Sequence, residues 1–246
     1  MSGHNKWSTI KRKKGAIDAK RGKIFTKLIK EISVAASEGG ADPDANPRLR
    51  LAIQNAKGVN MPKENIQRAI SKANKDSSSF QEVTFEGYLQ NGIGVFVECL
   101  TDNNNRTVSN IRAIFNKRGG TLGTNGSLSF LFERKGIITV PKCDMDPDEF
   151  ELAMIDAGAE EIDVDEENCI ITTAMEDFHA VQKKLLEMGL EPTNAELQRI
   201  PTDMKQLSTE DAVKILRVIE EFEDDDDVQA VFHSLEVTNE ALERMD

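Results

Sequence analysis

The sequence predicts an α+β protein of three domains: an N-terminal three-helix domain, then two α/β (ferredoxin-like) domains, the third inserted in the second. Three observations support this. Apolar residues recur at helical spacing through the first quarter of the 246-residue chain, short strand patterns begin near residue 80, and a β-α-β-β-α-β series follows Gly136. The predicted domains are residues 1–79, residues 80–134 with 202–246, and residues 135–201.

The first domain is predicted to open with a basic arm, residues 2–16, and to continue as three helices. Apolar residues from Phe25 to Ala36 mark the first helix. Asn46-Pro47 and Asn60-Met61-Pro62 indicate two further helix starts, because asparagine caps a helix and proline is tolerated in its first turn. Residues 77–79, three serines, are predicted to be a linker.

The second domain is predicted from two separate stretches of chain. In the first stretch the expected elements are strands at 83–85, 94–100 and 128–132 and a helix at 108–115, with a glycine-rich loop from Gly119 to Ser127. In the second stretch, Ser208 with Asp211 resembles a capping box before a helix with apolar residues from Ala212 to Phe222, and a final strand is expected at 228–237. This C-terminal helix and strand would complete the second domain. Because they follow the third domain in the sequence, we predict that the third domain is inserted in the second.

The third domain is predicted from a complete alternation of elements. Strands are expected at 137–140, 161–164, 169–173 and 191–200. One helix is expected to start at Asp146-Pro147, and the other carries apolar residues from Phe178 to Met188. This order is the ferredoxin-like, split βαβ arrangement.

Composition excludes several classes of protein. No apolar run approaches the 18 residues of a membrane span, and no apolar stretch follows the basic N-terminus as in a secretory signal. The three cysteines are far apart and form no metal-binding or disulfide spacing, which fits a reducing cytosol. We therefore expect a cytoplasmic protein with no membrane partner.

Charge is distributed unevenly along the chain. The net charge is −12, but residues 1–75 hold 17 Lys+Arg against 6 Asp+Glu, whereas residues 135–246 hold 9 against 31. The front is thus at +11 and the rear at −22, and a region so basic attracts polyanions. We expect the front third to be a cationic surface for a sugar–phosphate chain, kept apart from the acidic rear.

The candidate nucleic-acid-binding residues follow from this charge pattern. Four lysines of the first helix step by three, four and three residues, which places them along one face, and Trp7 could stack on an exposed base. The alternative is that the lysines only solvate a helix and that Trp7 fills a small core. The predicted site comprises Lys6, Trp7, Lys11, Arg12, Lys13, Lys14, Lys20, Arg21, Lys23, Lys27, Lys30, Arg48, Arg50 and Arg106.

Base-specific contacts need Arg, Asn or Gln aimed at base edges. The candidates for such contacts are Arg48, Arg50, Gln54, Asn55 and Gln67. No recognised helix-turn-helix or zinc-finger motif surrounds them. The sequence therefore predicts contacts with phosphates but no mode of base-specific recognition. Such a surface serves DNA and ribosomal RNA equally.

Long stretches of the chain resemble one family. The segments GHNKWSTIKRKKGAIDAKRGKIFTKLIKEI, GGADPDANPRLRLAI, NMPKENIQRAI, ECLTDNNNRTVSNIR and GSLSFLFERKG are similar to the YebC family of probable transcriptional regulators, whose mitochondrial relative is a translational activator of cytochrome oxidase subunit I. The resemblance implies three domains with the third inserted in the second, cytoplasmic location and no enzyme activity. It implies DNA-binding regulators in some members and ribosome-associated translation factors in others.

Other charged or glycine-rich segments have simpler interpretations. The stretch Asp102–Arg106 is typical of a capped helix start, although an open helix end with Arg106 could also bind an anion. The loop Gly119–Ser127 lacks the phosphate-loop order, so a turn, or a loop that touches RNA, is favoured over catalysis. The acidic run from Glu220 to Asp227 lacks EF-hand spacing, and a solvated helix end is favoured over a basic protein partner or mimicry of nucleic acid.

The sequence therefore predicts a non-enzymatic regulator that binds DNA. The alternative is a ribosome-associated translation factor that binds ribosomal RNA and ribosomal proteins. His4, His179 and His233 share no metal spacing, and we find no catalytic cluster. No metal, cofactor or small-molecule substrate is expected, and the oligomeric state is not predicted.

Overall fold

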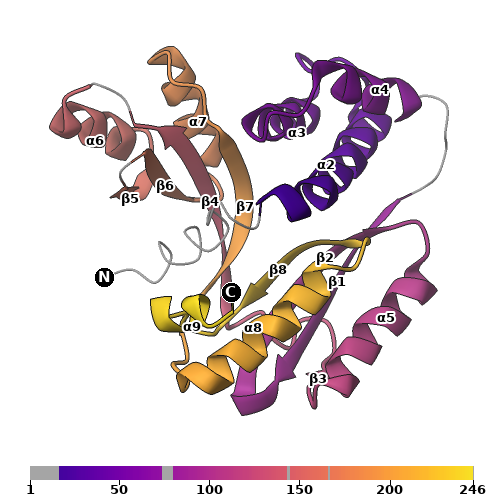
Figure 1. Ribbon diagram of the computed structural model, residues 1–246. Coiled ribbons are helices and arrows are strands. Elements are labelled where there is room, and N and C mark those ends of the chain that lie inside the picture. Colours follow the sequence, from indigo (N-terminus) through magenta and orange to yellow (C-terminus); the bar gives the residue numbers. More distant parts are fainter. Residues whose placement is uncertain (1–16, 74–79, 143–144, 166, 246) are drawn as a thin grey trace. The chain divides into compact units, whose positions relative to one another are not determined.

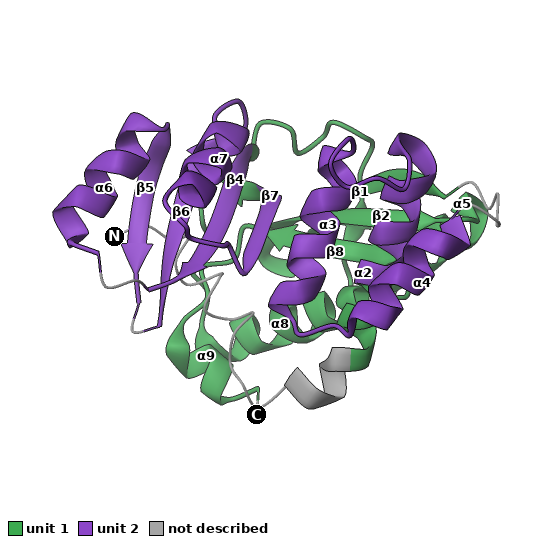
Figure 2. Cartoon of the chain, turned by 90° about the horizontal axis from the view of Figure 1, so that it is seen from above, with its two compact units in different colours: residues 1–27, 78–133, 199–246 green, residues 28–77, 134–198 purple. Residues whose placement is uncertain are grey.

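The computed structural model describes residues 17–73, 80–142, 145–165 and 167–245, with the helical backbone alone for residues 17–21 (Figure 1). The α+β class is confirmed: a helical region is followed by two four-stranded antiparallel sheets. The chain forms two compact units. Unit 1 contains residues 1–27, 78–133 and 199–246, and unit 2 contains residues 28–77 and 134–198 (Figure 2). The domain boundaries predicted from the sequence stay a prediction.

The helical region contains the three predicted helices: α2 (Ile17–Gly39), α3 (Pro47–Gly58) and α4 (Lys63–Ala73). The predicted cap of α3 is confirmed. The side chain of Asn46 accepts the amide of Leu49 at 3.1 Å and donates to the carbonyl of Ala35 at 2.7 Å, so one buried asparagine both starts α3 and fixes it against α2.

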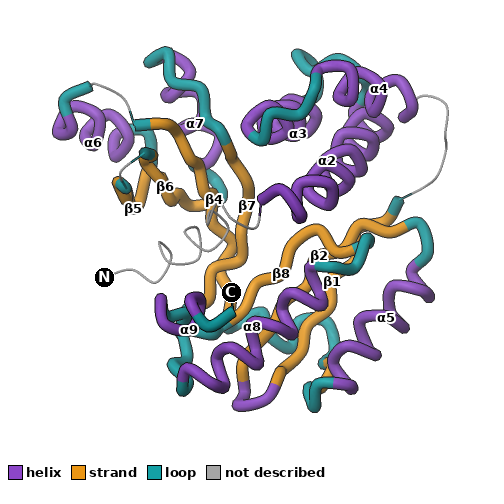
Figure 3. The backbone as a smooth tube through the Cα atoms, viewed as in Figure 1, coloured by secondary structure: helices purple, strands orange, loops and turns teal. Residues whose placement is uncertain are grey.

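Unit 1 contains a sheet with strand order β3-β1-β2-β8. Its strands are β1 (Gln81–Leu89), β2 (Ile93–Thr101), β3 (Thr121–Leu122) and β8 (Val228–His233). Helices α5 (Asn104–Lys117) and α8 (Thr209–Glu223) pack on one face of this sheet (Figure 3), over a core that includes Phe115 and Phe222 with ring centroids 4.8 Å apart. The short helix α9 (Asn239–Glu243) follows β8.

Two tight features shape this sheet. A 3₁₀ turn, η2 (Gln90–Gly92), joins β1 to β2, and Asn91 and Gly92 both adopt a positive φ there. Gly87 lies where a Cβ would stand 2.5 Å from the carbonyl oxygen of Thr121 and 2.8 Å from the ring of Phe115. Only glycine therefore lets β1 pair with β3 beneath α5.

Unit 2 contains most of the second sheet, with strand order β5-β6-β4-β7. Its strands are β4 (Phe132–Pro141), β5 (Ala159–Val164), β6 (Asn168–Ala174) and β7 (Asn194–Pro201). Helices α6 (Pro147–Asp156) and α7 (Phe178–Glu187) pack on one face around Met154, Ile171 and Leu185. This order and connectivity match the predicted ferredoxin-like arrangement.

Several details of the sequence prediction differ from the structure, among them the short strand β3 inside the predicted loop 119–127. Residues 125–131 form turns rather than a strand, and only Phe132 of the predicted strand 128–132 belongs to a strand, because buried Glu86 accepts the backbone amides of Gly126 and Leu128. Strand β8 ends at His233 and not at residue 237, since the chain then turns and forms only an isolated bridge from Leu235 to Lys205. Helix α9 was not predicted because its five residues are too short for a periodic pattern.

Candidate nucleic-acid interface

The predicted site divides into residues that the structure describes and residues that it does not. Lys6, Trp7 and the cluster from Lys11 to Lys14 lie outside the described residues. Lys20 and Arg21 belong to the first turns of α2, where the backbone alone is described. The contacts below concern the remaining six: Lys23, Lys27, Lys30, Arg48, Arg50 and Arg106.

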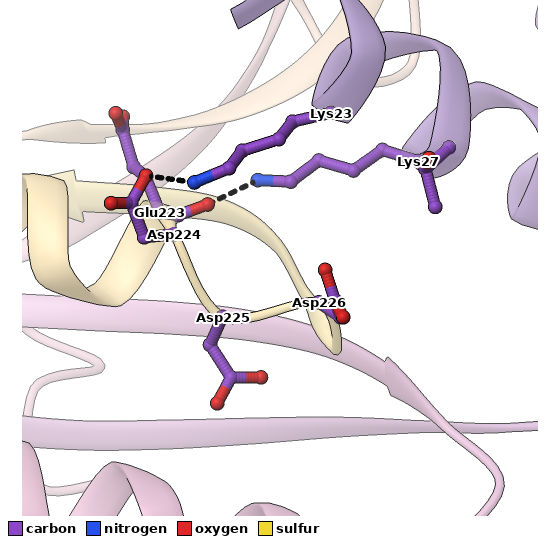
Figure 4. Close-up of a pocket in the computed structure, with 7 residues that line it drawn as sticks. Lys23, Lys27, Glu223, Asp224, Asp225 and Asp226 are labelled. Carbon is purple, nitrogen blue, oxygen red and sulfur yellow. Dashed lines mark hydrogen bonds and ion pairs between the residues drawn. The ribbon is translucent and has the colours of Figure 1, made fainter.

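Lys23 and Lys27 lie one turn apart on α2 and both meet the acidic end of α8 (Figure 4). The Nζ of Lys23 lies 2.6 Å from Oδ1 of Asp224, and the Nζ of Lys27 donates to the backbone carbonyl of Glu223 at 3.1 Å. Both partners belong to unit 1. The expectation that the cationic front stands apart from the acidic rear is therefore wrong at these two lysines.

Arg48 and Arg50 hold the helical region together. Arg48 Nε lies 2.8 Å from Oε1 of Glu31 and its Nη1 lies 2.7 Å from Oε2 of Glu38, so the guanidinium joins α3 to α2. Arg50 donates to the carbonyls of Pro43 and Asp44 in the loop before α3. Lys30 is half-buried on α2. In this structure the two arginines have partners within the region, and their role in binding nucleic acid stays a prediction.

Two of the residues considered for base reading also have structural partners. The side-chain amide of Asn55 donates to the carbonyl of Ala195 and accepts the amide of the same residue, both at 2.9 Å. Because β7 is an edge strand, this pair continues its hydrogen-bonding ladder onto α3. Gln54 donates to the carbonyl of Pro192 at 3.2 Å. These contacts favour a structural role for both side chains.

Arg106 lies in the first turn of α5, beside a buried carboxylate. Its Nη2 lies 2.7 Å from Oδ2 of Asp227 and 2.9 Å from Oδ1 of Asp102, and the Asn103 side chain caps the helix by accepting the Arg106 amide. The hydrogen bond to Asp227, then that to Asp102, raises the pKa of Arg106 above its ordinary value. The capped helix start is confirmed. The anion-binding alternative stays a prediction, with two carboxylates as the groups that an anion would have to replace.

Asp227 is a residue that the sequence analysis did not single out from its acidic run. The hydroxyls of Thr101 and Thr107 lie 3.2 and 2.8 Å from the same oxygen that binds Arg106. The amide of Leu100 donates to the Asp227 carbonyl at 2.7 Å, so the residue also fixes the start of β8 beside β2. No local pattern indicates this role, because its partners lie about 120 residues away.

The glycine-rich loop is held by a second buried carboxylate. Glu86 on β1 is 4% exposed and accepts the amides of Gly126 and Leu128 at 2.8 and 2.7 Å. Arg118, at the start of the loop, forms an ion pair with Glu221 of α8. These contacts favour the interpretation of the loop as an ordered turn.

Possible metal ligands do not cluster in the described part of the chain. His233 is fully buried, and burial lowers its pKa to about 4, so its ring is neutral at pH 7. Within the described residues, no three His, Cys, Asp or Glu side chains are grouped to hold a metal ion. None of the described helices combines the length and apolarity needed to cross a bilayer.

Comparison with known proteins places this architecture in one family. Residues 5–76 match the model of the TACO1/YebC protein N-terminal domain, and residues 80–235 match the TACO1/YebC second and third domain. A probable transcriptional regulatory protein from Amoebophilus asiaticus is 52% identical over 96% of this chain and 98% of its own length. One from Geotalea uraniireducens is 49% identical over the full length of both.

A solved structure is similar over almost the whole chain. The crystal structure of a conserved hypothetical protein from Aquifex aeolicus is 43% identical, covers 94% of this chain and 96% of its own, and superposes with a TM-score of 0.81. The sequence matches and this structural similarity agree with the resemblance found in the sequence segments. The chain belongs to the TACO1/YebC family.

Proposed function

We propose that this protein is a non-enzymatic, cytoplasmic regulator of gene expression that binds DNA through α2 and the basic residues before it. The charge separation along the chain carries the proposal: residues 1–75 hold a net +11 within a protein of net charge −12. Curated relatives over the full length carry the name probable transcriptional regulatory protein, which supports a regulatory role.

Helix α2 can present lysine side chains to the phosphates of a nucleic acid. Its apolar side, including Ile32, Ala35 and Ala36, is buried, whereas the lysines at 20, 23, 27 and 30 recur on another side of the helix. A buried apolar stripe fixes the direction of a helix, so the described lysines, Lys23, Lys27 and Lys30, lie away from that stripe. Each lysine that meets a phosphate of duplex DNA adds about 0.9 to the slope of log affinity against log salt.

The test reverses the charge of Lys11, Arg12, Lys13 and Lys14 to Glu and measures duplex binding by fluorescence anisotropy at several salt concentrations. We expect at least about a tenfold loss of affinity and a shallower salt slope. The matched control reverses four exposed cations of the remaining chain, Arg134, Lys142, Lys183 and Arg217, and changes the net charge equally. Equal affinity of the two variants at every salt concentration would contradict the proposal.

A ribosomal role is the second candidate, and the acidic rear favours it. A net charge of −22 in residues 135–246 is repelled by DNA but fits basic ribosomal proteins, while the cationic front would hold ribosomal RNA. Sedimentation of a cell extract through a sucrose gradient separates the two after DNase treatment. Migration with ribosomes supports this second role, and migration only with small proteins contradicts it.

A further inference from the structure

The acidic turn after α8, residues 223–226, lies against two lysines of α2. It forms a shallow hollow with an interior of about 10 Å³, the space of one water molecule, lined by Lys23, Thr26, Lys27 and the four acidic residues (Figure 4). Such a hollow is too small for a ligand. The feature is a contact between two parts of unit 1, with one ion pair at 2.6 Å and one lysine-to-carbonyl hydrogen bond at 3.1 Å.

The end of α8 is electrostatically unfavourable by itself. A helix C-terminus carries partial negative charge and favours cations, yet the last turn of α8 has no basic residue and ends in Glu223 followed by four aspartates. Arg118 pairs with Glu221 in this last turn, and the two lysines of α2 bring further positive charge to the residues that follow it. Lys23 meets a charged carboxylate oxygen and Lys27 meets a carbonyl oxygen with partial negative charge, so both lysines face electronegative oxygens, as they would on a phosphate backbone.

The contact between Lys23 and Asp224 is weak enough for another anion to replace the carboxylate. The Lys23 and Asp224 side chains are 46% and 57% exposed, and an exposed pair of this kind contributes little stability. A nucleic acid offers several phosphates at once and gains from the release of its counterions. It can therefore outcompete a single carboxylate, but must first displace it.

We propose that the acidic turn 223–226 is an intramolecular competitor that occupies Lys23 and Lys27 until nucleic acid displaces it. The inference rests on the proposed function, since it concerns the same lysines. It explains why a family member with a basic first region also carries an acidic run at this place in the fold. The turn sets a threshold for binding, because a weak or short polyanion does not displace it.

The test compares three forms of the full-length protein for binding of a 20-base-pair duplex at 0.1 M salt. The first is the wild type, the second is Asp224→Asn with Asp226→Asn, and the third is the control Glu151→Gln with Asp156→Asn. The control removes two exposed acidic residues on α6 and changes the net charge equally. Asp225 and Asp227 are kept because Asp225 accepts the amide of Asp227 at 2.9 Å.

We expect the turn variant to bind about two- to fivefold more tightly than the control, as befits the loss of one exposed ion pair. We also expect Lys23 in the free protein to react faster with an acetylating reagent in the turn variant than in the control, as read by mass spectrometry. Equal affinity and equal Lys23 reactivity in the two variants would overturn the inference while the proposed function stands. Absence of binding by all three forms at low salt would overturn both.

Discussion

Asp224 and Asp227 belong to the same run of four aspartates, yet the structure gives them opposite surroundings. The Asp227 side chain is 5% exposed and receives three side chains from β2 and α5, whereas the Asp224 side chain is 57% exposed and receives one lysine from α2. The difference shows that burial and the number of donors, and not the residue type or its sequence neighbours, distinguish a carboxylate inside the fold from one in a single surface ion pair.

The backbone explains why the two carboxylates diverge over three residues. Asp224 follows the last residue of α8 and stays at the surface, while Asp227 precedes β8 and is drawn toward β2 by its carbonyl, which accepts the Leu100 amide. Asp225 lies between them and accepts the Asp227 amide, so it fixes the turn. One short acidic segment thus has a surface carboxylate at its start and a buried carboxylate at its end.

The largest expected effect comes from removing the buried member of the pair. Asp227→Ala leaves the buried hydroxyls of Thr101 and Thr107 without their shared acceptor and removes one of the two carboxylates that bind Arg106, so we expect the free energy of unfolding to fall by about 2–4 kcal/mol. Urea unfolding followed by circular dichroism measures it. Asp224→Ala is the control, and an equal loss in both variants would refute the distinction drawn from burial.

The sequence predicted the helix starts well because capping is local. Asn46 and Ser208 hydrogen-bond to amides three residues ahead, as their patterns indicated. It failed at residues 128–131, where an apolar run suggested a strand. There the deciding contact comes from Glu86, about 40 residues earlier, and no window of neighbouring residues contains it.

Glu86 provides the intermediate case: a buried carboxylate whose partners are backbone amides instead of charged groups. Glu86→Ala leaves the amides of Gly126 and Leu128 without an acceptor, and we expect a loss of about 1–3 kcal/mol. Hydrogen exchange at the Leu128 amide should become faster, together with a lower urea midpoint. Glu82→Ala, an exposed position on the same strand, serves as the comparison, and protection of Leu128 should persist there.

The candidate site was predictable in its charge but not in its contacts. Spacing alone grouped Lys20, Lys23, Lys27 and Lys30 on one side of a helix, because helical geometry is periodic. The partners of Lys23 and Lys27 depend on where α8 ends, and this is set by packing some 200 residues later. The partner of Asn55 was equally unpredictable. Its amide suggested contacts with bases, but in the structure it hydrogen-bonds to Ala195 on the edge strand β7.

The smallest expected effect concerns the exposed pair itself. Reversing Lys23→Glu or Asp224→Lys singly should lower stability by at most about 0.5 kcal/mol, because both side chains are exposed and screened by salt. The double reversal should restore part of the loss, since the pair is rebuilt with opposite polarity. A double-mutant cycle of melting temperatures at 0.05 and 0.5 M salt measures the coupling. A coupling that keeps its size at high salt would mean that Asp224 resembles Asp227 after all, and that the acidic turn holds α2 in place instead of yielding it to a phosphate chain.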